Sequence, residues 1–464
     1  MKKSLSLVLT VFLSLTAAIP ASAAVSYLPG VTAGMSQGSY WTEDQTVHMT
    51  AEEIKALNTL TISAEGTNMY NLKELPETVD GFALNEALKT SSQADTSYYL
   101  GWTYLGSNKL AEQKDFDKMI ANTQNPKPSS EQAVKYAVAV NHTELRSFPS
   151  DTPIWDAVSD PDTDYQYLVS VRVNEPLVIT SVSADGKYYL AKSICCSGWV
   201  PVEDVAVCRN KKQWLTAWDI PAEEALVVYG DKVYTETSQT GKQTSARMLI
   251  MGTVLRLEEV SDPRMLIDNR SAYQNHVAWM PVRNEDGSYA KRLTLFSEHK
   301  KVSEGYLPLT QENIAEVALS ALGNTYGWGG SLDSTDCSGY IRNIYKCFGL
   351  ELARNTTWQT AMPMAKVDLQ GMTTEERKAV LDETPMGAVL YFRGHEMMYL
   401  GCENGTYYVI SAIGNIIDPM GSKNVQRISS VVINTLDTRR GNGNTWLDDL
   451  TTVIVPFEDG LTAE

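Results

Sequence analysis

Histidine and cysteine, the side chains that most often bind metals, are scarce in this sequence. The 464 residues include 5 His and 6 Cys, and no group of them has the spacing of a zinc site. Basic residues are also in the minority, because 39 Lys and Arg stand against 56 Asp and Glu, for a net charge of −17. We therefore expect no metal and no cofactor, and the charge disfavours nucleic acid as a partner.

Long hydrophobic segments are missing except at the N-terminus. Met1-Lys2-Lys3 is a short positive region, residues 5–19 form a mostly apolar core, and Ala21-Ser22-Ala23 is a small-residue cleavage site. These features are typical of a secretory signal peptide over residues 1–23, and the apolar run is too short for a membrane span. We expect an exported, monomeric protein that is extracellular, in the cell wall or periplasmic, with no membrane span after signal cleavage.

The six cysteines do not form an obvious disulfide framework. Cys337 and Cys347 are ten residues apart on one predicted helix, about 15 Å along its axis, which is too far to bridge. Cys195 and Cys196 are adjacent and rarely pair with each other. One disulfide, between Cys208 and either Cys195 or Cys196, is left as an alternative.

Cys337 lies in the segment Asp336-Cys337-Ser338-Gly339, ahead of apolar residues at helical spacing. Asp336 is a good N-cap, so Cys337 is predicted to be the first helical residue, where the helix dipole favours an anion. A thiolate is the nucleophile of cysteine hydrolases, and such a position lowers its pKa. The alternative is a buried structural cysteine.

One histidine, His395, follows Cys337, and the other four precede residue 303. It stands at the mouth of a predicted hairpin whose turn is Asn404-Gly405. If Cys337 needs an imidazole partner within its own domain, His395 is the candidate. The alternative is an ordinary loop histidine.

The ordered motifs around these two residues resemble the NlpC-type papain-like cell-wall cysteine peptidases. The resemblance covers roughly residues 304–457 and is carried by these motifs: Tyr326-x-Trp328-Gly329-Gly330, Asp336-Cys337-Ser338-Gly339, Arg354-x-Thr356-x-x-Gln359, Gly394-His395 and Tyr399-Leu400-Gly401.

The resemblance implies roles for single residues. Cys337 would be the nucleophile and His395 the base, acting through a thioacyl-enzyme. Tyr326 would help to stabilise the oxyanion. The substrate would be contacted by Asp336 and Ser338, and Thr356 keeps the hydroxyl of the matching family position.

The residue that orients the imidazole departs from the family pattern. The family usually has a histidine on the return strand, and Ser411 stands at that place. A two-residue turn at Asn404-Gly405 would put Ser411 opposite Met398 and turn it away from His395, unless a bulge intervenes. A serine, a backbone carbonyl or Asn415 could each orient the ring, so Ser411 is a candidate third catalytic residue.

The preceding part of the chain divides into three regions. Residues 24–130 are predicted to be mainly helical and to end in a linker, with a capping box at Thr50-Ala51-Glu52-Glu53. Residues 131–215 and 216–302 contain short strands separated by turns. Residues 303–464 form the predicted peptidase domain.

A repeat links the two strand-rich regions. Gly198-Trp199-Val200-Pro201-Val202 recurs as Ala278-Trp279-Met280-Pro281-Val282, which resembles bacterial SH3-type domains. We therefore expect an α+β protein: a papain-like C-terminal catalytic domain preceded by two small SH3-like β-barrels and a mainly helical N-terminal region.

The substrate follows from the resemblance alone. Relatives with this architecture cut the γ-D-glutamyl bond to a diamino acid in peptidoglycan stem peptides, often after a free N-terminal L-alanine. A free ammonium would be bound by carboxylates, for which Asp336 and Glu175 are the candidates; Glu175 could equally be a solvated turn residue. An amidase on the same fold and a catalytically weakened cell-wall-binding protein stay open as alternatives.

Overall fold

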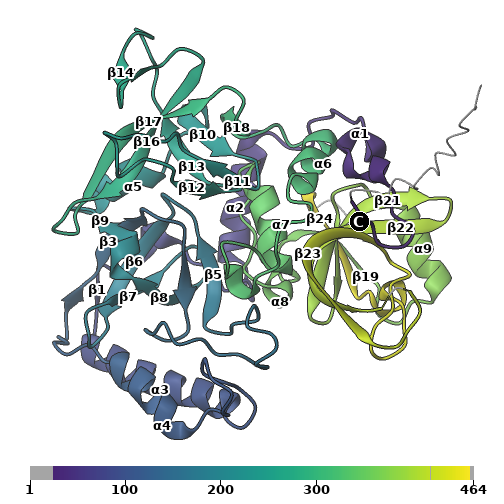
Figure 1. The fold of residues 1–464 in the computed structure, drawn as a ribbon, viewed down its shortest axis with the longest axis horizontal. Coiled ribbons are helices and arrows are strands. Elements are labelled where there is room, and N and C mark those ends of the chain that lie inside the picture. Colours follow the sequence, from purple (N-terminus) through teal and green to yellow (C-terminus); the bar gives the residue numbers. More distant parts are fainter. Residues whose placement is uncertain (1–24, 419, 460–464) are drawn as a thin grey trace, which may run out of the picture.

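The computed structural model describes residues 25–418 and 420–459 (Figure 1). The signal peptide predicted over residues 1–23 lies outside this part of the chain. Among the described residues, no helix combines the length and hydrophobicity that crossing a membrane requires. All six cysteines lie within the described part and are free.

The helices of the N-terminal region are divided between two parts of the molecule. Helices α1 (Gly38–Trp41) and α2 (Ala51–Ser63) lie beside the C-terminal domain, and Met35 and Leu57 are buried in its core. Helices α3 (Gly81–Tyr99) and α4 (Gln113–Asn122) lie along the first sheet (Figure 1). The predicted capping box is present at the start of α2, where Thr50 and Glu53 bond each other's backbone N–H groups.

Two antiparallel sheets follow. The first has the order β5-β4-β8-β7-β6-β3-β9, and its strands are β3 (Lys135–Ala139), β4 (Thr143–Arg146), β5 (Tyr167–Val171), β6 (Pro176–Val182), β7 (Tyr188–Lys192), β8 (Ser197–Pro201) and β9 (Val205–Val207). The second has the order β17-β16-β13-β10-β18, with β10 (Ala225–Val228), β13 (Val254–Leu257), β16 (Asn275–Arg283), β17 (Tyr289–Ser297) and β18 (Val302–Glu304). Helix α5 (Lys211–Trp218) connects them.

The two closed SH3-like barrels are not confirmed. Within the described residues the end strands of neither sheet pair with each other, so both sheets stay open. Local alternation of apolar and polar residues predicts strands, but barrel closure needs pairing between strands that are distant in sequence. The repeated tryptophans do lie in strands, Trp199 in β8 and Trp279 in β16.

Short two-stranded ribbons complete this half of the molecule. They are β1 (Thr78–Val79) with β2 (Gln132–Ala133), β11 (Lys232–Tyr234) with β12 (Met248–Ile250), and β14 (Leu266–Ile267) with β15 (Arg270–Ser271).

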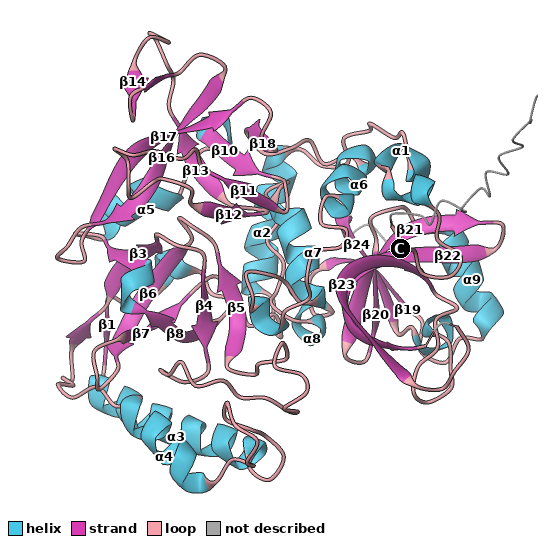
Figure 2. Cartoon of the chain, viewed as in Figure 1, coloured by secondary structure: helices cyan, strands magenta, loops and turns pink. Residues whose placement is uncertain are grey.

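The C-terminal domain packs helices against a six-stranded antiparallel sheet of order β19-β24-β20-β21-β22-β23 (Figure 2). The strands are β19 (Met364–Asp368), β20 (Val389–Phe392), β21 (His395–Glu403), β22 (Thr406–Ile417), β23 (Val425–Thr435) and β24 (Thr452–Asp459). The helices are α6 (Gln311–Leu319), α7 (Cys337–Lys346), α8 (Thr356–Gln359), α9 (Thr374–Glu383) and α10 (Trp446–Asp449).

Helix α7 is the central helix of this domain. It contacts β21 and β22 directly, and its tyrosines anchor it: Tyr340 donates a hydrogen bond to the Ala318 carbonyl at 2.7 Å, and Tyr345 to the Gly387 carbonyl at 2.5 Å. Both tyrosine side chains are fully buried. The first residue of α7 is therefore fixed relative to the strand that carries His395.

Candidate active site

Cys337 is the first residue of α7, as the sequence predicts. The N-cap is Asp336, whose Oδ1 accepts the Gly339 N–H at 2.8 Å. Cys337 is partly buried, and its own N–H belongs to the first turn of the helix, where backbone donors have no partner within the helix.

Asp336 and Ser338 belong to a buried network with Arg354. The Arg354 guanidinium donates to Asp336 Oδ2 at 2.6 Å and Oδ1 at 3.2 Å, and to Ser338 Oγ at 2.8 Å. The Gly329 N–H donates to Asp336 Oδ2 at 3.0 Å. Burial alone would raise the pKa of Asp336, but the Arg354 charge and these hydrogen bonds hold it below its usual range. The network therefore fixes the helix start and leaves Asp336 without a free oxygen for an ammonium.

Ser411 contacts His395, with 3.1 Å between Ser411 Oγ and His395 Nε2. The hairpin begins with the register of its two-residue turn, Glu403 opposite Thr406, but a bulge between Tyr399 and Gly401 shifts it by one residue. Beyond the bulge Met398 pairs with Ile410 rather than with Ser411. Because a shift of one residue exchanges the two faces of a strand, Ser411 turns to the face of His395.

Aromatic side chains surround the imidazole. The ring centroids of Trp446 and Phe392 lie 5.2 Å and 5.5 Å from that of His395, and the Arg440 guanidinium lies 4.1 Å from the Phe392 ring. Burial, and secondly the Arg440 charge, lower the pKa of His395 to about 3. The resting imidazole is therefore neutral.

The Cys337 thiol is also neutral at rest. Burial, followed by the charges of Asp336 and Glu396, raises its pKa well above the usual value, although the Glu396 backbone N–H lies near the sulfur and opposes the shift. The helix position alone would lower this pKa, so burial, and secondly the neighbouring carboxylates, reverse the expectation from the sequence. Among the described residues no hydrogen bond joins the thiol to the His395 ring.

Tyr326 lies near the thiol. Its ring packs beside Gly414 of β22, and burial followed by the charge of Cys337 raises its pKa strongly. The phenol is therefore a protonated donor at the start of α7.

Two glycines of the loop before Cys337 are required by the first sheet. A Cβ at Gly329 would lie 2.3 Å from the Tyr167 carbonyl oxygen, and one at Gly330 would lie 1.7 Å from Ser170 Oγ. Both glycines also have positive φ. Strand β5 therefore packs directly against the loop that leads to Cys337.

Glu175 is paired with a neighbouring arginine. Its Oε2 accepts hydrogen bonds from the backbone N–H and the guanidinium of Arg172, at 3.0 Å and 3.2 Å. Arg172 in turn donates to Asn343 on α7, six residues beyond Cys337 and so about 9 Å along the helix. The Glu175 side chain is 9% exposed and forms an ion pair with Arg172, so it is not a solvated turn residue, and an ammonium would have to compete with Arg172 for it.

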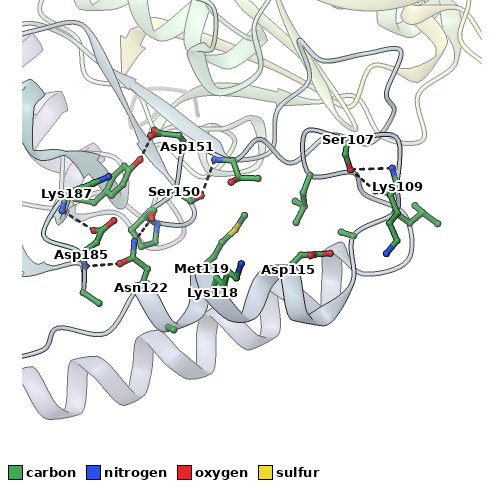
Figure 3. A pocket seen from close by; sticks show the side chains of 18 residues that line it. Ser107, Lys109, Asp115, Lys118, Met119, Asn122, Ser150, Asp151, Asp185 and Lys187 are labelled. Carbon is green, nitrogen blue, oxygen red and sulfur yellow. Dashed lines mark hydrogen bonds between the residues drawn. The ribbon is translucent and has the colours of Figure 1, made fainter.

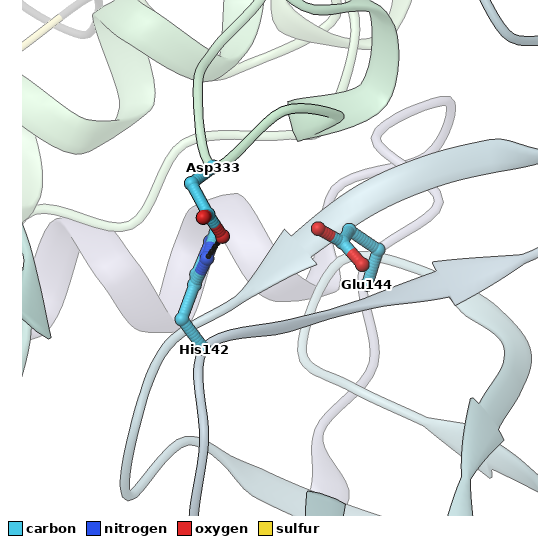
Figure 4. A group of neighbouring side chains, drawn as sticks. All are labelled: His142, Glu144 and Asp333. Carbon is cyan, nitrogen blue, oxygen red and sulfur yellow. Dashed lines mark hydrogen bonds and ion pairs between the residues drawn. The ribbon is translucent and has the colours of Figure 1, made fainter. Parts of the chain in front are cut away.

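A different acidic group lies beside the loop. Asp333, in the loop before Cys337, faces Glu144 of β4 and His142, which directly precedes β4 (Figure 4), with 3.1 Å between Asp333 Oδ1 and His142 Nδ1. One ligand atom from each of the three lies within 4.8 Å of the others. Burial raises the pKa of Glu144. No local sequence pattern marks these three residues as a group, because they come together only when β4 meets the loop.

A large surface pocket lies elsewhere. It has a volume of about 950 Å³ between α4 and the loops of the first sheet (Figure 3), and its lining includes Lys118, Asp151 and Asp185. No residue of the Cys337 region lines it.

A cysteine at the start of a helix, packed on an antiparallel sheet that carries a histidine, defines a papain-like domain. Residues 323–454 match the NlpC/P60 family, so the C-terminal part of the chain is a domain of that family.

A solved structure has the same fold over most of the chain. An NlpC/P60 endopeptidase from Photobacterium damselae subsp. piscicida superposes with a TM-score of 0.72 at 16% identity, covering 94% of this chain and 99% of that chain. An NlpC/P60 family protein from Bacillus cereus gives a TM-score of 0.44 at 13% identity, with 69% and 99% covered.

One curated relative is similar in sequence. Dipeptidyl-peptidase 6 of Lysinibacillus sphaericus is 29% identical over 105 residues, which is 22% of this chain and 33% of the relative. The match thus spans a third of the length of that relative.

Proposed function

We propose that the protein is an exported cysteine endopeptidase that hydrolyses the γ-D-glutamyl–diamino acid bond of peptidoglycan stem peptides. Its preferred substrates would be released muropeptides with a free N-terminal L-alanine. The observation that carries the proposal is the placement of Cys337 at the start of α7 in an NlpC/P60 domain, with His395 positioned by Ser411 on the adjoining sheet.

The neutral thiol and neutral imidazole favour a coupled attack. As Cys337 Sγ bonds to the carbonyl carbon, its proton passes to His395 Nδ1, since Ser411 engages Nε2. The Cys337 N–H and the Tyr326 hydroxyl donate to the oxyanion, each contributing about 10²–10³ in rate. The C–N bond then breaks as His395 returns the proton to the leaving amine, and water hydrolyses the thioacyl-enzyme with His395 again as base.

Replacing Ser411 should test how the ring is oriented. Ser411→Ala removes one hydrogen bond to the imidazole, and we expect kcat to fall about fivefold, as for a contact of about 1 kcal/mol, with KM nearly unchanged. Ser411→His, which restores the family's usual residue, should retain more activity than alanine. Steady-state kinetics on one tripeptide would measure both; an alanine variant with wild-type kcat would show that another group orients His395.

The free-amine preference needs a carboxylate that no arginine already neutralises. Asp336 and Glu175 are both paired with arginines, whereas Glu144 and Asp333 lie together beside the loop before Cys337. We expect Glu144→Gln to raise KM about tenfold for a free-amine tripeptide and to leave KM for its N-acetylated form unchanged, whereas Glu175→Gln should leave both unchanged. Equal KM changes for the two peptides would remove Glu144 from amine recognition.

Mass spectrometry of products would test the proposed bond. The protein would be incubated with L-Ala-γ-D-Glu-diamino acid peptides and, separately, with cross-linked sacculi. Release of L-Ala-D-Glu from the free peptide supports the endopeptidase, whereas cleavage at the sugar–peptide junction would identify an amidase. No cleavage together with failure of a thiol-directed probe to label Cys337 would favour a cell-wall-binding protein.

A further inference from the structure

Glu396 is a fully buried carboxylic acid directly after His395. Its side chain is 0% exposed, and neither carboxylate oxygen has a hydrogen bond of ordinary geometry in the described structure, although the Thr356 hydroxyl and the Gln359 amide lie near the carboxylate. An ionised carboxylate in such a place loses its hydration with little compensation. A group of this kind beside a nucleophile needs a functional explanation.

The groups that face Glu396 come from three parts of the domain. Helix α7 and its cap contribute Cys337 and the Asp336 carboxylate, and strand β20 contributes the Tyr391 phenol. The segment that ends in α8 contributes the Arg354 guanidinium, the Thr356 hydroxyl and the Gln359 amide.

No cation among these groups is free to neutralise Glu396. Arg354 is engaged by Asp336 through both of its terminal nitrogens. The Gln359 side chain already donates to the Ala353 carbonyl and accepts from Tyr391. Burial, helped by the Asp336 charge and opposed by Thr356, Arg354 and Gln359, raises the pKa of Glu396 to about 8.

Glu396 acts on the Cys337 thiol in two opposite ways. Its backbone N–H lies near the sulfur and favours the thiolate, whereas a charge on its carboxylate disfavours the thiolate. A neutral Glu396 retains the first effect and removes the second.

We propose that Glu396 is a positioning residue with a proton-dependent effect on the nucleophile: as a neutral acid it permits the thiolate of Cys337, and as a carboxylate it suppresses it. The consequence of this effect for catalysis rests on the proposed function. The effect of Glu396 on the reactivity of the Cys337 thiol can be measured without any substrate.

The rate of alkylation of Cys337 by iodoacetamide, measured from pH 5 to pH 10, tests the proposal. Rates would be read from the Cys337 peptide by mass spectrometry, because Cys402 is exposed and would also react. In Glu396→Gln we expect roughly tenfold faster alkylation of Cys337 between pH 8 and pH 10, equivalent to a thiol pKa lower by about one unit. Glu403→Gln, which removes the same charge from the exposed end of β21, should leave the alkylation rate unchanged. A Glu396→Gln rate equal to that of the wild type throughout this range would overturn the proposal.

Thermal unfolding supplies an independent check. The pKa of Glu396 is raised in the folded state above its ordinary value of 4.5, so the folded protein loses stability as the pH rises from about 4.5 to about 8. The gain in Tm from Glu396→Gln should therefore be small at pH 5 and larger at pH 8. A gain that does not depend on pH would contradict a raised pKa of Glu396 in the folded protein. Glu396→Met gives the same comparison if the glutamine variant does not fold.

Measurements of peptide cleavage separate the proposed endopeptidase function from the proposed role of Glu396. If the protein cleaves stem peptides, the alkaline decline of kcat/KM should move to higher pH in Glu396→Gln. Faster alkylation of Cys337 in Glu396→Gln without any cleavage of stem peptides by the wild type would count against the proposed function and leave the role of Glu396 intact.

Discussion

Replacing Cys337 with alanine is expected to abolish hydrolysis of stem peptides, with kcat falling by at least about 10⁴-fold. The loss follows because no other cysteine is placed to attack: Cys195, Cys196, Cys208 and Cys347 are buried, and Cys402 lies at the exposed end of β21. Tm should change little, since Cys337 is only partly buried and the substitution removes a single sulfur atom. Kinetics and thermal unfolding on the same preparation measure both effects.

Cys402→Ala is the matched control for this variant. It removes an exposed thiol from the same domain and should leave kcat and KM unchanged. Calorimetry should still detect tripeptide binding to the Cys337→Ala protein, because the binding groups are untouched. Cleavage retained by the alanine variant would place the nucleophile elsewhere.

Replacing Arg354 with methionine is expected to give the largest loss of stability, about 3–5 kcal/mol. Arg354 and Asp336 side chains are 8% and 9% exposed, so the variant leaves a buried carboxylate without its cation. That carboxylate also caps α7 and binds the Gly329 N–H, so activity should fall with stability. Arg264→Met, which breaks the exposed pair with Asp262, should cost less than about 1 kcal/mol.

The pH dependence of this loss has a definite sign. In the wild type the pKa of Asp336 lies below its ordinary value of 3.8, so the pair stabilises the fold above that value and the contribution is lost as the pH falls through the folded pKa. Without Arg354, burial instead favours the neutral acid. The difference in Tm between the two proteins should therefore narrow from pH 7 to pH 4; a constant difference would show that Asp336 does not carry the effect.

The parts of the site that depend on local sequence could be predicted. Asp336 as N-cap and Cys337 as the first residue of α7 follow from the preferences of a helix terminus, which act over a few residues. The contact of Ser411 with His395 required a bulge, and Gly401 inside the strand was a local sign of one. The hairpin turn at Asn404-Gly405 has its predicted two-residue register as far as that bulge.

The parts that depend on pairing between distant segments could not be predicted. Arg354 neutralises Asp336 from 18 residues away, and Trp446 reaches His395 from α10. For Glu175, an Asn-Glu-Pro sequence indicates an exposed turn, and nothing local shows that Arg172 will bury and pair it. The open form of the two sheets likewise depends on which distant strands pair, a property that a repeated tryptophan motif does not specify.

Trapping the acyl-enzyme tests the central claim most directly. The protein would be mixed with a γ-D-glutamyl tripeptide, quenched in acid within one turnover, digested and mapped by mass spectrometry. Attack by the sulfur predicts an L-Ala-D-Glu acyl group on the peptide that contains Cys337, absent from Cys337→Ala. An acyl group on another residue, or turnover that leaves this peptide unmodified while the alanine variant still cleaves, would contradict the account.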